Sequence, residues 1–195
     1  MTMTDEALMH AVQQGDLAKL GGLFERHHLA VFDFLARMTG SRAVAEDLVQ
    51  DVFERILKYR ATWRGDAPFS AWLFRIARNA RADYYRRRVL TATYTEAMDG
   101  EDPAPNPERQ LEDESESARL QRALLKLRED KRELIVLARY REMKYEAIAE
   151  LLGVDVATIK VRVHRALKEL RDIFLTLESR PSCAAKTSLK SSQTI

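Results

Sequence analysis

Apolar residues recur three and four positions apart along most of the chain, with polar residues between them. Because an α-helix turns once every 3.6 residues, this spacing gives each segment one apolar face and predicts amphipathic helices. We expect helices at residues 5–14, 16–38, 43–59, 68–88, 118–127 and 131–140, followed by two shorter ones within 145–170. The periodicity is absent from residues 91–117 and from residues 179–195. The pattern therefore predicts an all-α protein made of two small helical domains.

Residues that favour turns and helix caps set the predicted boundaries. Gly15 ends the first helix, and Asp16 is placed to cap the second, because a short polar side chain there accepts hydrogen bonds from unpaired helix amides. Ser41 is the predicted cap of the third helix. The loop that follows this helix ends at Asp66 and Pro68, which favour the start of the fourth helix.

The stretch 145–170 divides into two helices at Gly153, and Asp155 is placed to cap the second one. One face of the second helix is apolar: Val156, Ile159, Val163, Leu167 and Leu170. Most of its remaining surface is basic: Lys160, Arg162, His164, Arg165, Lys168 and Arg171. This combination favours a helix-turn-helix whose basic face contacts DNA phosphates. The alternative is a helical hairpin of the core with a solvated basic face.

The composition is that of a globular protein, with 46% hydrophobic and 32% charged residues and only 7 Gly and 5 Pro. The single cysteine, Cys183, excludes an internal disulfide and any zinc site built from several cysteines. There is no apolar run of about 18 residues that could span a membrane and no apolar signal-peptide segment at the N-terminus. We therefore expect a cytoplasmic protein without membrane insertion.

The net charge of +2 hides an uneven distribution. Residues 91–117 carry nine acidic side chains and one basic side chain, and they include the proline-rich run PAPNP. Residues 1–90 and 118–178 are helical and mildly basic. This arrangement indicates two domains that face nucleic acid, joined at 91–117 by a flexible acidic linker and followed by a disordered tail at 179–195.

Two further surfaces are candidates for binding. The helix 43–59 collects acidic and amide side chains on one side: Glu46, Asp47, Gln50, Asp51 and Glu54. Such a face is either simply solvated or a docking surface for a basic partner helix. The helix 68–88 mixes aromatic residues with arginines, which suits a surface for single-stranded nucleic acid. Most of these aromatics are expected in the core, but Trp63, in the loop beside Arg64, is expected to be exposed and able to stack on a base.

Nothing in the sequence indicates an enzyme. It contains no glycine-rich nucleotide loop and no set of residues spaced as metal ligands. His27 and His28 are adjacent on a helix and therefore point about 100° apart, which does not suit a shared metal. We expect no catalytic residue, no metal and no cofactor.

Three segments in this order resemble the extracytoplasmic-function (group 4) sigma factors of bacterial RNA polymerase. AEDLVQDVFERIL resembles their segment 2.2, RGDAPFSAWLFRIARNARADYYRRR their segments 2.3–2.4, and LLGVDVATIKVRVHRALKELR their segment 4.2. The resemblance implies sigma region 2 at 1–90 and sigma region 4 at 118–178. It also implies a promoter-specificity subunit that binds core polymerase and promoter DNA and helps to melt the −10 region.

The resemblance carries over to individual residues. Docking on the clamp helices of the β′ subunit would use Asp47, Gln50, Asp51 and Glu54. Reading and holding the −10 strand, including one flipped base, would use Trp63, Arg64, Asp66, Arg75, Arg78, Asn79 and Arg86. Reading the −35 element would use Lys160, Arg162, His164, Arg165 and Lys168. Val161 stands where a small polar residue is frequent in the family, which bears on the −35 sequence recognised.

The resemblance also implies contact with the β flap of the polymerase and control by an anti-sigma factor. The main alternative is a free-standing helix-turn-helix regulator whose N-terminal domain serves dimerisation or sensing. Promoter-dependent run-off transcription with core polymerase distinguishes the two, because only a sigma factor would support it.

Overall fold

The computed structural model describes residues 3–95 and 115–178, and within them it contains helices and turns but no strand. The first group of helices is α1 (Asp5–Gln13), α2 (Lys19–Thr39), α3 (Arg42–Tyr59), the short 3₁₀ helix η1 (Arg60–Thr62) and α4 (Phe69–Thr95). The second group is α5 (Glu116–Lys126), α6 (Glu129–Ile135), the π-helical turn η2 (Val136–Tyr140), α7 (Tyr145–Leu152) and α8 (Val156–Glu178). The predictions of an all-α fold and of two helical units are confirmed. We call the two groups the N-terminal region and the C-terminal region.

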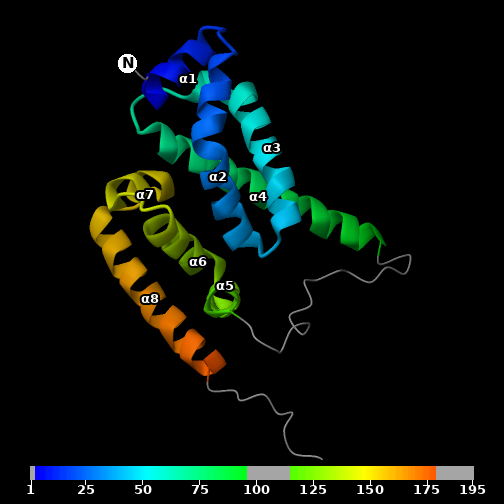
Figure 1. The fold of residues 1–195 in the computed structure, drawn as a ribbon, viewed down its shortest axis with the longest axis vertical. Coiled ribbons are helices and arrows are strands. Elements are labelled where there is room, and N and C mark those ends of the chain that lie inside the picture. The colour runs from blue at the N-terminus through cyan, green and yellow to red at the C-terminus, as the bar shows by residue number, and fades with distance from the viewer. Residues whose placement is uncertain (1–2, 96–114, 179–195) are drawn as a thin grey trace, which may run out of the picture.

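The two regions pack against each other (Figure 1). In the N-terminal region α2 and α3 lie side by side and α4 passes behind them, while in the C-terminal region α8 runs along the outside of α6 and α7. α7 contacts α4, and α2 contacts α5, α6 and η2. One cluster of buried apolar side chains extends through both regions, from Leu8 and Phe34 to Leu137 and Ile148. The chain therefore has a closed arrangement, in which the regions share part of their core.

Several helix ends are those predicted. Ser41 caps α3, and its hydroxyl accepts a hydrogen bond from the amide of Val44 at 3.3 Å. Gly153 ends α7 with a φ of +66°, a left-handed conformation that glycine adopts at little cost. Asp155 caps α8, because its Oδ1 accepts from the amide of Thr158 at 2.7 Å. These two residues form the turn of the predicted helix-turn-helix.

Other boundaries differ from the predictions. Asp16 does not cap α2, which begins only at Lys19. The amide of Asp16 instead donates to the carbonyl of Ala11 at 3.0 Å, and this bond closes the end of α1. The helix predicted at 131–140 is α6 followed by the π-helical turn η2. In η2 the amide of Arg141 donates to the carbonyl of Val136 at 3.0 Å, one residue farther than in an α-helix.

The fourth helix is longer than predicted. α4 continues to Thr95, past the predicted end at residue 88 and into the first residues of the predicted linker. No glycine or proline interrupts the chain between Pro68 and Gly100, which explains why the helix does not stop earlier. Residues 96–114 of the predicted linker, and the predicted tail at 179–195 with Cys183, lie outside the described residues.

Candidate nucleic-acid interface

A cavity of about 640 Å³ opens between α3, the loop at residues 60–68, and α4. Six of the seven residues predicted to hold −10 DNA line it together: Trp63, Arg64, Asp66, Arg75, Asn79 and Arg86. The seventh, Arg78, lies on another side of α4, where its Nε is 2.6 Å from Oε1 of Glu133 in the C-terminal region. The wall also includes residues that were not predicted as part of a site, among them Arg55 and Asp83.

Trp63 is buried, with 4% of its surface exposed, so the prediction of an exposed ring was wrong. Its indole packs edge-on against His10 of α1, with ring centroids 5.1 Å apart. Gln13 holds the loop in place, because its side-chain amide donates to the carbonyls of Arg60 at 2.8 Å and Trp63 at 2.7 Å. The cover thus comes from α1, about fifty positions earlier in the chain, which local sequence patterns do not reveal.

The loop needs a glycine at its tip. Gly65 has a φ of +75°, in the left-handed region that side chains disfavour. It places Arg64 and Asp66, both exposed, on the rim of the cavity. The amide of Phe69, at the start of α4, donates to Oε1 of Glu6 at 3.4 Å, so a side chain of α1 also supports the predicted start of this helix.

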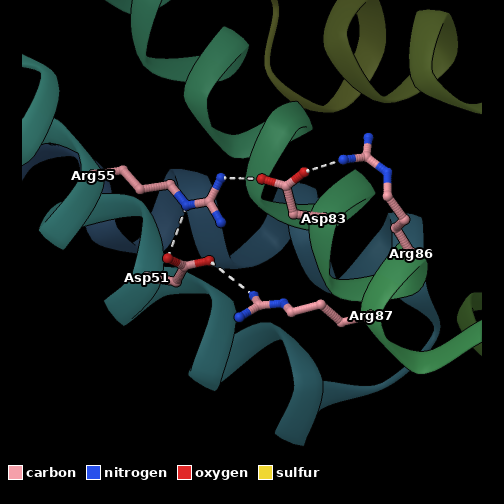
Figure 2. Close-up of polar contacts among 5 residues, drawn as sticks. All are labelled: Asp51, Arg55, Asp83, Arg86 and Arg87. Carbon is pink, nitrogen blue, oxygen red and sulfur yellow. Dashed lines mark hydrogen bonds and ion pairs between the residues drawn. The ribbon is translucent and has the colours of Figure 1, made fainter. Parts of the chain in front are cut away.

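Charged contacts join α3 to α4 beside the cavity, as Figure 2 shows. Arg55 donates from Nε to Oδ1 of Asp51 at 2.8 Å and from Nη1 to Oδ2 of Asp83 at 2.6 Å. Asp83 also accepts from Nη1 of Arg86 at 3.0 Å. Nη2 of Arg87 lies 3.9 Å from the second oxygen of Asp51. We call these five residues the Arg55 network.

The network shifts the pKa of two of its members. The hydrogen bond from Arg55 is the main reason that the pKa of Asp83 lies below its usual value. The hydrogen bond to Asp51 is the main reason that the pKa of Arg55 is raised. Both shifts favour the charged form of the group concerned. Asp51 and Arg55 are four residues apart on one helix, so the sequence alone could have suggested the ion pair between them. The hydrogen bond from Arg55 to Asp83 is visible only in the folded structure.

The residues predicted for polymerase docking do not share one environment. Asp47, Gln50 and Glu54 are exposed on α3. Asp51 is half-buried, and its carboxylate belongs to the Arg55 network. Three of the four residues therefore form an open surface with two carboxylates and one amide, and the fourth lies at its border with α4.

The helix-turn-helix presents the predicted −35 residues to solvent. Lys160, Arg162, His164, Arg165 and Lys168 are all exposed on α8. The opposite face is buried through Ile159, Val163, Ala166 and Leu170, at the spacing of one helical stripe. Val161 is 49% exposed and lies among the basic residues.

The described part of the chain gives no sign of a metal site or a membrane span. It contains no group of three or more His, Cys, Asp or Glu placed to hold a metal ion. Nε2 of His27 is instead 2.7 Å from the carboxylate of Asp5, and the His28 ring stacks on Phe24. None of the helices in this part is both long enough and apolar enough to cross a membrane.

Comparison with known proteins identifies both regions. The family model for sigma-70 region 2 matches residues 23–91, and the model for sigma-70 region 4 matches residues 117–170. The chain is 31% identical over 153 residues to RNA polymerase sigma factor YlaC of Bacillus subtilis, a match that covers 76% of this chain and 88% of YlaC. It is 29% identical over 174 residues to the ECF RNA polymerase sigma-E factor of Escherichia coli, covering 84% and 91% of the two chains.

Solved structures agree with this assignment. The structure of CnrH in complex with the cytosolic domain of CnrY matches with a TM-score of 0.68 and 28% identity, over 90% of this chain and 99% of the other. The sigma factor RpoE of Bartonella quintana, solved with the anti-sigma factor NepR, matches with a TM-score of 0.64 and 26% identity, over 83% and 98%. The chain belongs to the sigma-70 family of RNA polymerase sigma factors, in its extracytoplasmic-function subfamily.

Proposed function

We propose that this sigma factor directs core RNA polymerase to promoters with three surfaces that have separate tasks. The exposed acidic face of α3 docks on the polymerase, the cavity beside α4 captures the −10 strand, and α8 reads the −35 element. The observation that carries most of the proposal is that six residues assigned to −10 DNA line one cavity. Membership of the sigma factor family favours this role over that of a free-standing helix-turn-helix regulator.

Docking uses Asp47, Gln50 and Glu54, whose side chains are exposed on adjacent turns of α3. The carboxylates of Asp47 and Glu54 complement a basic helical surface such as the clamp helices of the β′ subunit, and complementary charges raise both specificity and association rate. Asp51 has a different part in the proposal. It holds Arg55 at the border between the docking face and the cavity. It contacts the polymerase only at the edge of the docking face.

The cavity is suited to a base that has left the DNA stack. Flipping a base costs a few kcal/mol, which stacking and edge hydrogen bonds must offset. Asn79 carries both a donor and an acceptor for the base edge, while Arg64, Arg75 and Arg86 supply charge for the phosphates. Trp63 is part of the cavity wall. It contributes a buried ring rather than an exposed surface on which a base could stack. Stabilising the flipped base gives the sigma factor a means of strand opening without nucleotide hydrolysis.

Reading of the −35 element falls to α8. A helix-turn-helix places its second helix in the major groove, with the first turns of that helix against the base edges. The five exposed basic residues, Lys160, Arg162, His164, Arg165 and Lys168, divide between bases and phosphates.

The chain itself is proposed to be non-catalytic, since it alters the specificity of nucleotidyl transfer by the polymerase. It would act in the cytoplasm, where the polymerase works.

An anti-sigma factor is a further proposed partner. RpoE of Bartonella quintana was solved with the anti-sigma factor NepR, and this chain resembles RpoE over 83% of its length. A partner of this class would bind when the sigma factor is inactive.

Run-off transcription with purified core polymerase and a promoter template tests the proposal. Addition of the chain should produce a promoter-dependent transcript, and Asp47→Arg with Glu54→Arg should abolish most of it by weakening core binding. Glu25→Arg, an exposed acidic position on α2, is the matched control and should transcribe normally. If the chain yields no transcript but binds duplex DNA without polymerase, the free-standing regulator replaces this proposal.

A further inference from the structure

Two apolar side chains interrupt the basic face of α8. Seven positions between residues 156 and 168 are exposed, and five of them carry the basic residues assigned above to the −35 element. The other two are Ala157 and Val161, and Val161 has 49% of its surface exposed. Single exposed apolar residues are ordinary on a protein surface, so exposure alone gives Val161 no role. Its place on the helix is what distinguishes it.

Val161 lies opposite the buried face of α8. Ile159 is fully buried, and a residue two positions later is turned by about 200° around a helix. Val163, which is also buried, is turned by the same angle in the other direction from Val161. The Val161 side chain therefore projects from the part of the helix farthest from the core. When a helix lies in the major groove with its buried face toward the protein, this part points at the base edges.

The neighbours of Val161 are placed to hold the two DNA strands on either side of it. Lys160 and Arg162 are each turned by about 100° from Val161, in opposite directions. Their exposed cations therefore suit the phosphates at both walls of the groove. Arg165 follows Val161 by four residues on the same side of the helix, where a guanidinium can reach a base edge. Phosphate contacts fix the position of the helix, and the base pair beneath Val161 is then read by direct contact.

The first turn of α8 adds little polar chemistry at this place. Ala157 precedes Val161 by four residues, so its methyl group is the neighbour toward the start of the helix. The carboxylate of Asp155 accepts from the amide of Thr158 at 2.7 Å and from the hydroxyl of Thr158 at 2.5 Å. Both oxygens of this carboxylate are thus already engaged within the cap. Ala157 and Val161 form a short apolar strip along the first two turns of the helix.

An apolar side chain distinguishes base pairs in the major groove through a single group. Thymine carries a methyl group at C5, whereas guanine, adenine and cytosine present mainly hydrogen-bond donors and acceptors there. Contact between methyl groups removes apolar surface from water on both sides. A valine against a polar base edge would instead exclude water without replacing its hydrogen bonds, which is unfavourable. A valine at this place therefore favours a T·A pair over a G·C pair.

We propose that Val161 is a specificity-determining residue, which selects a thymine in the −35 element by contact with the C5 methyl group of that base. The group recognised is a methyl group in the major groove, which 5-methylcytosine shares with thymine and which uracil and cytosine lack. The proposal rests on the proposed function for the placement of α8 in the major groove. It explains why an apolar residue stands at the centre of a face whose long side chains are otherwise basic.

Selection from a promoter library locates the base pair. Holoenzyme assembled from core polymerase and the full chain is bound to promoter fragments whose −35 region is randomised, and the bound fragments are sequenced. The wild type should enrich a T·A pair at one −35 position, and Val161→Ser should lose the enrichment at that position while keeping the others. Leu29→Ser removes an apolar side chain that is 65% exposed on α2, and this matched control should select as the wild type does. Identical selection by the wild type and Val161→Ser overturns the proposal.

Removal of one methyl group from the DNA tests the contact itself. Uracil in place of the selected thymine keeps the base pair and its hydrogen-bonding groups and lacks only the C5 methyl group. Wild-type holoenzyme should bind the uracil fragment about fourfold more weakly, since burial of one such group contributes about 0.8 kcal/mol and about 1.4 kcal/mol is tenfold. Val161→Ser should bind the thymine and uracil fragments equally. Wild-type affinity that does not respond to uracil overturns the proposal.

A methyl group added to cytosine gives the converse test. With a C·G pair at the selected position, 5-methylcytosine should bind wild-type holoenzyme about fourfold more tightly than cytosine does. If the two bases bind equally, the preference for thymine comes from another group and the proposal is overturned. Circular dichroism shows whether Val161→Ser is folded. If it is not, the uracil and 5-methylcytosine fragments decide, because both comparisons use the wild-type protein.

The same library separates this proposal from the proposed function. If the wild type enriches a −35 sequence and Arg165→Ala loses it, while uracil and Val161→Ser change nothing, α8 reads the element but Val161 does not select thymine. If the wild type enriches no sequence in the −35 region, both proposals are overturned.

Discussion

Replacement of Arg55 by methionine should destabilise the N-terminal region by about 2 kcal/mol. The substitution keeps most of the apolar stem but removes the hydrogen bonds to Asp51 at 2.8 Å and Asp83 at 2.6 Å. The Arg55 side chain is 17% exposed and the two carboxylates 29% and 36%, so neither contact is fully buried or fully solvated. Buried charged hydrogen bonds contribute about 1.5–3 kcal/mol and exposed ion pairs about 0–1 kcal/mol, which places each of these near 1 kcal/mol.

Urea unfolding followed by tryptophan fluorescence measures this loss selectively. Both tryptophans of the chain, Trp63 and Trp72, are buried in the N-terminal region, so their emission follows the unfolding of that region. A double-mutant cycle with Asp83→Asn should give a coupling free energy of about 1 kcal/mol. Lys58→Met removes a cation from an exposed position of α3 and should change the unfolding free energy by less than about 0.5 kcal/mol.

The pH dependence gives a second check. The pKa of Asp83 is lowered in the folded protein, so its contribution is complete above the unfolded value of about 3.9 and is lost as the pH falls through the folded value. The difference in unfolding free energy between wild type and Arg55→Met should therefore be full at pH 7 and shrink below about pH 4. A difference that stays constant down to pH 3, or a coupling below about 0.3 kcal/mol, would refute the role of the network.

The other surfaces give three more predictions. Asp47→Arg with Glu54→Arg should weaken binding to core polymerase by at least about tenfold in a pull-down titration and leave the helical content unchanged; unaltered affinity would contradict the docking assignment. Arg165→Ala should weaken binding of −35 duplex by about 1–3 kcal/mol in a fluorescence anisotropy assay, and a defect confined to −10 melting would show that the surfaces are wrongly assigned. Gly65→Ala should cost about 1 kcal/mol of stability through its φ of +75° and slow open-complex formation in a permanganate footprint, whereas normal rates would mean that the loop tip does not position the strand.

Local patterns in the sequence were enough for the helices and for the helix-turn-helix. The caps at Ser41 and Asp155 act within three residues of their partners, so their chemistry is readable from neighbouring letters. Asp16 was misassigned because its amide closes the preceding helix, a use of the backbone that leaves no trace in side-chain identity. Trp63 was misassigned because its cover is α1, which approaches only once the fold has formed.

The same reasoning explains which site features the sequence could not provide. The −10 residues converge because they follow one another along a loop and a single helix, which the motif already placed in order. The pairing of Arg78 with Glu133 joins positions on opposite sides of a stretch without periodicity, so nothing local connects them. In the sequence, Asp51 looked like one more member of the acidic face of α3. In the structure the Arg55 side chain joins it to Asp83 of α4, and this contact separates Asp51 from the other members of the face.

The π-helical turn η2 makes the register of the C-terminal region unusually sensitive to chain length. Its bond from Arg141 to Val136 spans one residue more than an α-helical bond, so the side chains at its end are turned by about 100° relative to the register of α6. This rotation is part of what sets Tyr140 against Arg37 and Arg141 against Asp33. Deleting a single residue here would convert the turn to α-helix and move Tyr140 and Arg141 away from these partners, whereas the same deletion in an ordinary surface loop would be absorbed. Alignments of related chains should therefore place their insertions and deletions elsewhere than at residues 136–141.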